Sequence, residues 1–181
     1  MKIRLLAFNT YLLAAALLLG CKTPQEKREA AESKKQKKEL STIRFHLEAE
    51  GDSSGRAEPV PILRAAPVLV NVIKDSFLDE RDVLKATLVD ADGGFSIRVQ
   101  LDDHGGFVLD TVTTSNKGKR LAIMTEATDR RWLAAPVITR RITDGVITFT
   151  PDATREESLR IVRGLNNTSL KIRKKGIISG L

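Results

Sequence analysis

Side chains that commonly catalyse reactions or bind metals are scarce in this sequence of 181 residues. It has one cysteine, Cys21, and two histidines, His46 and His104, which lie far apart in the chain. A zinc site usually needs three or four histidine, cysteine or carboxylate ligands at short, regular spacings. The sequence therefore predicts no metal site, and we expect both histidines to be solvated surface residues.

The adjacent carboxylates Asp102 and Asp103 are the remaining candidates for acid–base chemistry. They follow an alternating apolar segment and precede a helical pattern, so a strand end followed by a helix cap explains both residues. No nucleophile in the sequence has an obvious base beside it, and no glycine-rich phosphate loop is present. We therefore predict no catalytic residues, no cofactor and no enzymatic activity.

The N-terminus has the pattern of an export signal. Lys2 and Arg4 precede a mostly apolar run over residues 5–19, which is shorter than the roughly 20 residues of a membrane span. The run ends in Leu-Leu-Gly-Cys at Cys21, which resembles the lipobox of bacterial lipoproteins. The resemblance implies removal of residues 1–20 and acylation of the Cys21 thiol, which would attach the chain to a lipid bilayer. The alternatives are a plain signal peptide or an uncleaved anchor helix, with Cys21 incidental.

The basic charge of the chain is unevenly distributed. The net charge is +7 and the isoelectric point is about 9.7, values that favour a polyanionic partner when the charge lies on the folded part. Residues 22–41 hold seven basic and four acidic side chains, which leaves only about +2 on residues 42–181. We predict that residues 21–41 form a charged flexible linker that acts as a solvated spacer. The alternative is that its lysines contact anionic lipid headgroups.

Alternating apolar and polar residues predict an α+β domain over residues 42–175, with its core at residues 78–173 and a tail at residues 176–181. The expected strands are residues 42–48, 62–72 (one strand or two), 85–90, 95–101, 119–124, 132–142, 146–150 and 169–173. Asp144-Gly145 has the composition of a two-residue hairpin turn between residues 132–142 and 146–150.

Two amphipathic helices are predicted, over residues 103–115 and from Thr154 to about Gly164. Thr154 and Glu157 have the spacing of a capping box at the start of the second helix. From residue 95 onward the order of elements predicts a ferredoxin-like split β-α-β sheet with two helices on one face, plus an N-terminal β extension. The opposite, open face of this sheet would present Ser96, Arg98, Gln100, Arg120, Ala122 and Thr148.

Arginines are the candidate binding residues of the domain. Those selected are Arg98, Arg120, Arg130, Arg131, Arg140 and Arg141. The last four form two basic pairs that flank one predicted strand, and a solvated strand edge explains them without a ligand. The alternative is an electropositive rim beside an open sheet, where an extended peptide could bind through main-chain hydrogen bonds.

Several spaced segments resemble SecD, the accessory subunit of the bacterial Sec export machinery. Residues 116–123 (NKGKRLAI) are similar to its N-x-G-(K/R)-x-L-A-I segment, residues 135–138 (APVI) and 142–149 (ITDGVITF) to its next strand and hairpin, and residues 149–157 to the start of a helix. The resemblance covers about residues 78–166 and implies the head subdomain of the first periplasmic domain of SecD. It implies neither the membrane helices of SecD nor their proton-driven work.

Together these observations predict a non-catalytic lipoprotein of the cell envelope. It would face the periplasm, be anchored to the outer or the cytoplasmic membrane through acylated Cys21, and engage exported polypeptides or components of the Sec translocon. One alternative is a structural spacer domain without a role in export. Another is a nucleic-acid-binding module, but the expected open face lacks the stacking aromatic side chains that such binding uses, so we expect no nucleic acid partner.

Overall fold

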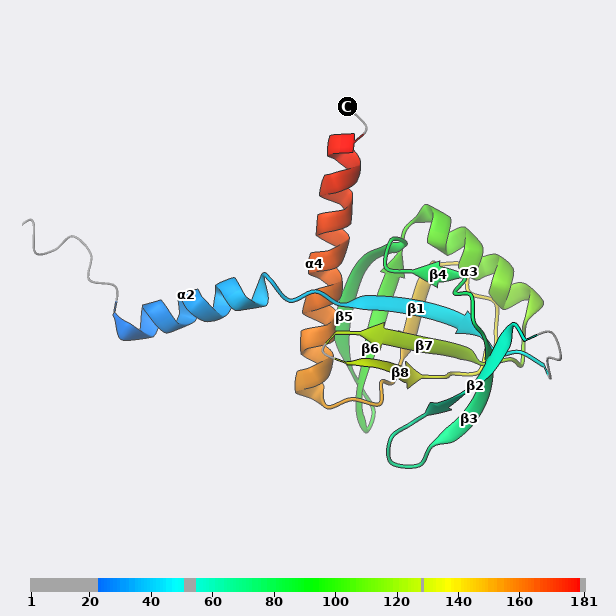
Figure 1. The fold of residues 1–181 in the computed structure, drawn as a ribbon. Helices are drawn as coiled ribbons and strands as arrows, with labels where there is room; N and C mark the ends of the chain where they lie inside the picture. Colours follow the sequence, from blue (N-terminus) through cyan, green and yellow to red (C-terminus); the bar gives the residue numbers. More distant parts are fainter. Residues whose placement is uncertain (1–22, 51–54, 128, 180–181) are drawn as a thin grey trace, which may run out of the picture. The chain divides into compact units, whose positions relative to one another are not determined.

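The computed structural model describes residues 23–50, 55–127 and 129–179, in two units that meet between Lys35 and Gln36. The predicted signal segment and Cys21 lie outside the described residues. The elements, in chain order, are α2 (Pro24–Gln36), β1 (Thr42–Leu47), β2 (Ala57–Ile62), β3 (Val68–Ile73), β4 (Leu78–Asp79), β5 (Val83–Ala91), β6 (Gly94–Leu101), α3 (Asp103–Ser115), β7 (Leu121–Glu126), β8 (Arg130–Ala134), β9 (Val146–Phe149) and α4 (Arg155–Ser179) (Figure 1).

The first unit contains a helix within the segment that was predicted to be a flexible linker. In α2 the hydroxyl of Thr23 accepts a hydrogen bond from the Glu26 backbone N–H, and the Glu26 carboxylate accepts one from the Thr23 N–H. This reciprocal pair is a capping box, which satisfies two backbone donors at the start of a helix. All the side chains described in α2 are exposed, so local propensity and capping, rather than packing, account for the helix.

The predicted α+β class is confirmed, but the strands divide among three antiparallel sheets instead of one. A four-stranded sheet has the order β4-β1-β7-β8 and a three-stranded sheet has the order β5-β6-β9. Among the strands that the structure describes, β2 pairs with β3 alone, in a hairpin. The strand predicted over residues 132–142 is correct for residues 132–134 and wrong beyond them, because β8 ends at Ala134 and Pro136 has no N–H to continue a ladder. Gly145 does take a positive φ of 64°, yet the turn leads from one sheet to the other and closes no hairpin.

Strand β1 belongs to the centre of the domain and not to an N-terminal extension. It lies between β4 and β7, and its register with β7 runs over six residue pairs, from Thr42 opposite Glu126 to Leu47 opposite Leu121. On its other side β1 pairs with the short strand β4, in which Leu78 lies opposite Phe45. The main sheet therefore requires residues that precede the predicted core at residues 78–173.

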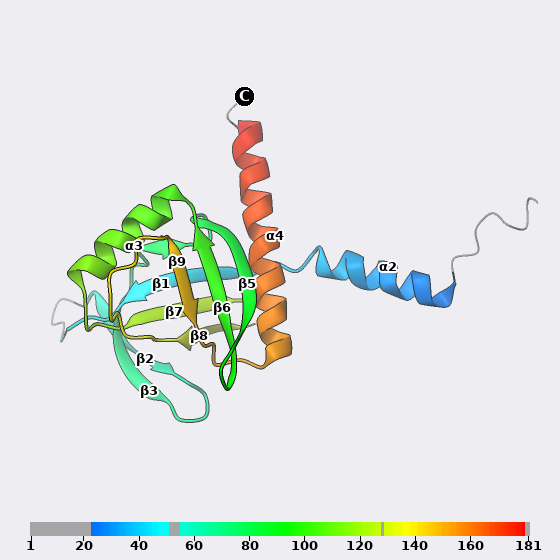
Figure 2. The same ribbon diagram turned by 180° about the vertical axis from the view of Figure 1, so that it is seen from behind.

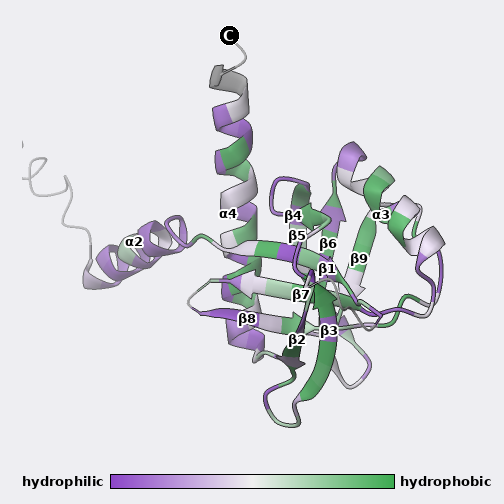
Figure 3. Ribbon diagram, turned by 45° about the vertical axis from the view of Figure 1, so that its right-hand side comes forward, coloured by the Kyte–Doolittle hydropathy of each residue, from purple (hydrophilic) through white to green (hydrophobic). Residues whose placement is uncertain are grey.

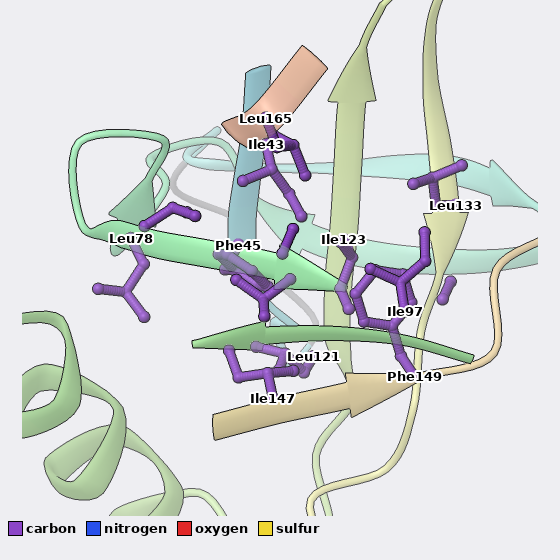
Figure 4. Packing of buried hydrophobic residues seen from close by; sticks show 14 of the residues in the cluster. Ile43, Phe45, Leu78, Ile97, Leu121, Ile123, Leu133, Ile147, Phe149 and Leu165 are labelled. Atoms are coloured by element: carbon purple, nitrogen blue, oxygen red, sulfur yellow. The ribbon is translucent and has the colours of Figure 1, made fainter. Parts of the chain in front are cut away.

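The main hydrophobic core lies between the two larger sheets, which face each other (Figures 1, 2 and 4). Its fully buried side chains include Ile43, Phe45, Leu78, Ile97, Leu101, Leu109, Ile123, Leu133, Ile161 and Leu165. Burial of each such side chain contributes about 1.5–3 kcal/mol to the free energy of unfolding. The alternation along β1 and β6 turns their apolar residues toward this space, as the sequence predicted.

The β2–β3 hairpin covers the other face of the four-stranded sheet. Val60, Ile62, Val70 and Val72 pack there with Ala122, next to the half-buried Trp132 and Ala135. Five consecutive residues of β7 are therefore buried, because the sheet is covered on both faces. The prediction that Ala122 lies on an open face is wrong for this reason.

Helix α3 confirms the prediction for residues 103–115, with Asp102 rather than Asp103 as its N-cap. The Asp102 carboxylate accepts a hydrogen bond of 2.8 Å from the Gly105 backbone N–H. The predicted capping box at α4 is confirmed for Thr154, whose hydroxyl accepts a hydrogen bond from the Glu157 N–H.

Helix α4 does not end near Gly164 but continues to Ser179. The strand predicted over residues 169–173 is therefore wrong, and the described part of the predicted tail is helical. Several polar side chains of α4 contact the backbone of other elements. The Asn166 amide accepts a hydrogen bond from the Ala86 N–H (2.8 Å) and donates one to the Ala86 carbonyl (2.9 Å), as a neighbouring strand would. Ser169 donates to the Val83 carbonyl, so α4 covers the outer edge of β5.

His46 is buried, contrary to the predicted solvated position. Its exposed fraction is 5%, and it lies beneath the β2–β3 hairpin with its ring 5.1 Å from that of Trp132 in an edge-on arrangement. Its Nδ1 lies 2.9 Å from the Ile73 carbonyl, which can only accept, so Nδ1 carries the proton. Nε2 is buried and has no hydrogen-bond partner among the residues that the structure describes. Burial lowers the pKa of His46 below its ordinary value.

The free energy of unfolding is expected to fall as the pH drops from 7 to 5, in a way that depends on His46. The unfolded chain binds a proton at His46 near pH 6.5, whereas the folded chain resists it because a charged Nε2–H would lack an acceptor. His46 contributes at most about 1.4 kcal/mol per pH unit to the change of the free energy of unfolding with pH. Urea unfolding followed by Trp132 fluorescence measures this slope, which should be shallower in His46→Leu.

The matched control for this prediction is His104→Gln, because the His104 side chain is 74% exposed and its Nδ1 pairs with Asp82 at the surface. This variant should leave the His46-dependent part of the slope unchanged. Equal pH slopes in wild type and His46→Leu would contradict a buried neutral histidine.

Candidate functional site

Three of the six candidate arginines hold elements of the fold together. The Arg120 guanidinium is half-buried and donates to the Ala135 carbonyl at 3.1 Å, while its backbone N–H donates to Glu48. Arg131 on β8 donates to the Asp152 carbonyl and forms an ion pair with Glu157 at the start of α4. Arg141 forms a bidentate ion pair with Asp110 on α3. These guanidinium groups are already engaged inside the molecule.

The Arg141 ion pair also changes the titration of its partner. Hydrogen bonding from the Arg141 guanidinium lowers the pKa of Asp110 below its usual range. Both groups lie at the surface, where such a pair adds little to stability. The pair instead fixes the segment that follows β8 against α3, since the Thr113 hydroxyl also accepts a hydrogen bond from the Ile142 N–H.

Arg98 and Arg140 are exposed and come together at one groove. Arg98 lies on the outer surface of β6, and Arg140 lies in the irregular segment between β8 and β9. Neither forms an ion pair with another described residue. Arg130, at the start of β8, is also exposed but contacts Met124 Sδ at 3.3 Å and lies away from this groove. The two basic pairs therefore do not flank a single strand.

The groove between β9 and residues 136–142 has a volume of about 330 Å³, and we call it the β9 groove. Its lining is Arg98, Leu121, Pro136, Val137, Ile138, Thr139, Arg140, Ile142, Asp144, Val146, Ile147 and Thr148. On its other wall, residues 136–138 follow the start of β7, with hydrogen bonds between Leu121 and Pro136 and between Ile138 and Lys119. The groove thus separates an edge of one sheet from an edge of the other.

Strand β9 lies at the end of its sheet and pairs with β6. The Leu101 N–H donates to the Gly145 carbonyl, so these two residues form a hydrogen-bonded pair, and such pairs alternate along an antiparallel ladder. The backbone N–H and C=O of Thr148, opposite Arg98, therefore point away from β6. Among the described strands none pairs with this edge, which leaves a row of backbone donors and acceptors for an added strand.

A second groove continues along the same strand. It has a volume of about 460 Å³, and we call it the hairpin groove. It is lined by Ile62, Leu63, Val68, Val70, Arg120, Ala134, Ala135, Pro136, Phe149 and Thr150. The β9 groove borders Val146–Thr148 and the hairpin groove borders Phe149 and Thr150, and both include Pro136. A chain extended along β9 would pass the two arginines and then meet an apolar surface.

One group of metal-ligand-type side chains occurs among the described residues, namely Asp82, Asp102 and His104. Asp82 pairs with His104 through one carboxylate oxygen and accepts the Asp79 N–H through the other. Asp102 caps α3. Hydrogen bonds within the protein account for these positions, so the group does not define a site.

The fold and the site define a small α+β domain of two facing sheets with an open strand edge, in which the described residues bring together no catalytic group. A family model supports a more specific statement. The model described as SecDF, P1 head subdomain, matches residues 62–172, and the chain belongs to this family. The predicted resemblance to the SecD head is thus confirmed. None of the helices that the structure describes has the length and apolar character of a bilayer span.

Two solved structures are similar to this chain. One is described as "Structure and function of a membrane component SecDF that enhances protein export"; the match covers 83% of this chain and 71% of that chain, with 19% identity and a TM-score of 0.54. The other, "Crystal structure of SecDF in Super-membrane-facing form", is matched over 82% of this chain and 21% of its own, again with 19% identity and a TM-score of 0.54. No curated protein matches the chain.

Sequence reasoning missed the position of the open edge. The expected site was a basic rim beside the open face of a single sheet, whereas the structure has its groove between the edges of two sheets. The strand break at Pro136 was the available signal, since it forces the chain to leave the β8 ladder before β9 begins.

Proposed function

We propose that this protein is a non-catalytic lipoprotein of the cell envelope whose SecD-like head binds extended segments of exported polypeptides along β9. The observation that carries the proposal is the unpaired edge of β9 beside the β9 groove. A polypeptide that is crossing or leaving a membrane is unfolded and extended, so it can add to a strand edge through main-chain hydrogen bonds.

The edge determines the geometry of the bound segment. Four residues of β9 span about 13 Å at roughly 3.3 Å per residue, so four or five residues of polypeptide would pair with it. Main-chain pairing is independent of sequence, which suits a protein that has to accept many exported chains. Neighbouring grooves then select among side chains.

The lining of the two grooves favours acidic and apolar side chains in the bound segment. Arg98 and Arg140 supply unpaired positive charge beside Thr148, and the hairpin groove supplies an apolar surface next to Phe149. Both charges are exposed, so each contributes up to about 1 kcal/mol. Affinity would therefore come mainly from the main-chain pairing.

Attachment to the bilayer is proposed through Cys21, the single cysteine of the chain. Its place after the apolar N-terminal run is the position that acylation requires. Membership of the SecDF head family supports a location on the outer side of the cytoplasmic membrane. The signal pattern, together with this location, supports periplasm-facing attachment. The α2 segment would then separate the anchor from the domain.

A cross-linking experiment in cells tests this function. A photoreactive amino acid at Thr148 should form adducts with exported polypeptides, and the same amino acid at Lys85 on β5, whose outer edge α4 covers, should not. Arg98→Glu with Arg140→Glu should reduce the Thr148 adducts roughly tenfold, because two exposed attractions become repulsive. Palmitate should label the wild-type chain and not Cys21→Ser, which tests the anchor separately.

The matched control for charge is Arg155→Glu with Arg160→Glu, since both residues are exposed on α4 away from the β9 groove. It should leave the Thr148 adducts unchanged. Equal adducts at Thr148 and Lys85, or adducts to Sec components alone, would contradict binding of polypeptide at β9. Palmitate labelling with no adducts at either position would indicate a spacer domain.

A further inference from the structure

A third groove, rich in lysine, lies on the opposite part of the domain, between residues 37–40 and the outer half of α4. It has a volume of about 820 Å³. It is lined by Lys37, Lys38, Leu40, Asn167, Leu170, Lys171, Lys174 and Lys175, which we call the lysine patch. It shares no residue with the β9 groove or the hairpin groove.

Hydrogen bonds fix the two walls of the patch against each other. The Asn167 amide donates to the carbonyls of Gln36 (2.8 Å) and Glu39 (2.9 Å). The Thr168 hydroxyl donates to the Ser41 carbonyl. The lysines that precede β1 are therefore held beside those of α4 by the fold, although the two groups lie more than 130 positions apart in the sequence.

The positive charge of the patch is not neutralised within the described part of the chain. None of its five lysines forms an ion pair with a described residue. The nearby carboxylate of Glu39 is engaged by Arg163 at 3.1 Å. Asn167, Leu170, Lys171 and Lys174 recur at the spacing of one helix face, whereas Arg173 donates to the Val83 carbonyl from another face. The charge is therefore concentrated on one side of α4.

Exposed leucines lie among these lysines. Leu40 is 45% exposed and Leu170 is 59% exposed, and purple and green segments alternate along the outer half of α4 (Figure 3). Lysines that surround exposed aliphatic side chains are the composition of surfaces that lie on anionic bilayers. Surfaces that bind single-stranded nucleic acid rely on aromatic stacking, and the patch contains neither an aromatic residue nor an arginine.

The course of the chain brings the patch within reach of a membrane. Lys37 follows α2 directly, and the 13 residues of α2 span about 20 Å. A bilayer attached at Cys21 would thus lie within a short contour length of the patch.

We propose that the lysine patch binds the surface of an anionic phospholipid bilayer. The lysine ammonium groups would contact lipid phosphates while Leu40 and Leu170 enter the interfacial region. The proposal rests on the envelope location argued above and not on polypeptide binding. Its test contains no polypeptide ligand, so either proposal can fail without the other.

Vesicle sedimentation of the full chain carrying Cys21→Ser tests the proposal without an acyl chain. Vesicles of phosphatidylcholine alone are compared with vesicles that also contain phosphatidylglycerol. The apolar N-terminal run contributes to binding of both, so the measured quantity is the ratio of the two partition coefficients. Lys171→Gln, Lys174→Gln and Lys175→Gln together should lower this ratio by about 100-fold, since each lysine near an anionic surface contributes about a factor of five.

The matched control replaces three lysines outside the patch, Lys74, Lys85 and Lys117, by glutamine. Both triple variants lose the same net charge, so the control should lower the ratio far less. Leu170→Ser should weaken binding to the anionic vesicles, and circular dichroism checks that each variant is folded. Equal losses in the two triple variants, or no preference of the wild type for anionic vesicles, would overturn the proposal. So would binding of RNA through the same three lysines in the absence of vesicle binding.

Discussion

Replacing Gly164 by alanine is expected to destabilise the domain by about 1–3 kcal/mol, although alanine is the better helix former. A Cβ atom at Gly164 would lie 2.8 Å from both the backbone nitrogen and the Cβ of Ser41. Real Cβ atoms do not approach backbone this closely, so the segment before β1 would have to move away from α4. Urea unfolding monitored by Trp132 fluorescence measures the loss as a lower midpoint.

Gly176→Ala in the same helix is the matched control, with an expected effect of opposite sign. A Cβ atom at Gly176 meets no atom of the described part of the chain within 4 Å, so a gain in helix propensity of up to about 1 kcal/mol is expected. If Gly164→Ala stabilised the domain as Gly176→Ala should, then residues 36–41 would not be packed on α4 in solution.

Asn166→Ala is expected to cost about 2–4 kcal/mol, because it leaves both backbone groups of Ala86 without a partner. Ala86 is 1% exposed, so water cannot replace the lost amide at the edge of β5. The same unfolding experiment measures the change, and hydrogen exchange at the Ala86 amide should become faster in the variant. This second measurement separates loss of the edge contact from a general loss of helix stability.

The control for Asn166 is Asn71→Ala on β3, where the side chain is exposed. The expected change in the free energy of unfolding for this variant is below about 0.5 kcal/mol. A similar loss of unfolding free energy at both positions would show that the Asn166 hydrogen bonds to Ala86 do not stabilise the edge of β5. The Asn166 and Gly164 variants test different contacts of α4. Asn166 joins α4 to β5, whereas Gly164 lies against Ser41 in the segment before β1.

Local patterns were sufficient to predict most strands and α3. The alternation of Phe95, Ile97, Val99 and Leu101 depends only on neighbouring residues, and β6 follows it. Pairing between distant segments was not visible in this way. Nothing in residues 42–47 indicates that β1 lies between β4 and β7, and nothing near His46 shows that a hairpin covers its face of the sheet.

The end of α4 was predicted near Gly164, and the polar residues that follow Gly164 explain why this prediction was wrong. Asn166, Asn167 and Ser169 have the composition of a helix stop, yet their side chains are used to bind backbone groups of β5 and of residues 36–39. Among the candidate site residues, type alone could not separate Arg98 and Arg140, which remain exposed, from Arg131 and Arg141, which pair with acids of α4 and α3. Those acids lie 26 and 31 positions away in the sequence.

The hydrogen bonds that hold residues 36–41 on α4 have a mechanical consequence. A tension applied through α2 enters the folded domain at Gln36, so the Asn167 and Thr168 hydrogen bonds carry the load before β1 does. Strand β1 is held along its length by β7 and would then be loaded in shear. If tension were applied through α2 while a polypeptide was bound at β9, these few hydrogen bonds would break first. The sheets that form the proposed binding site would keep their structure.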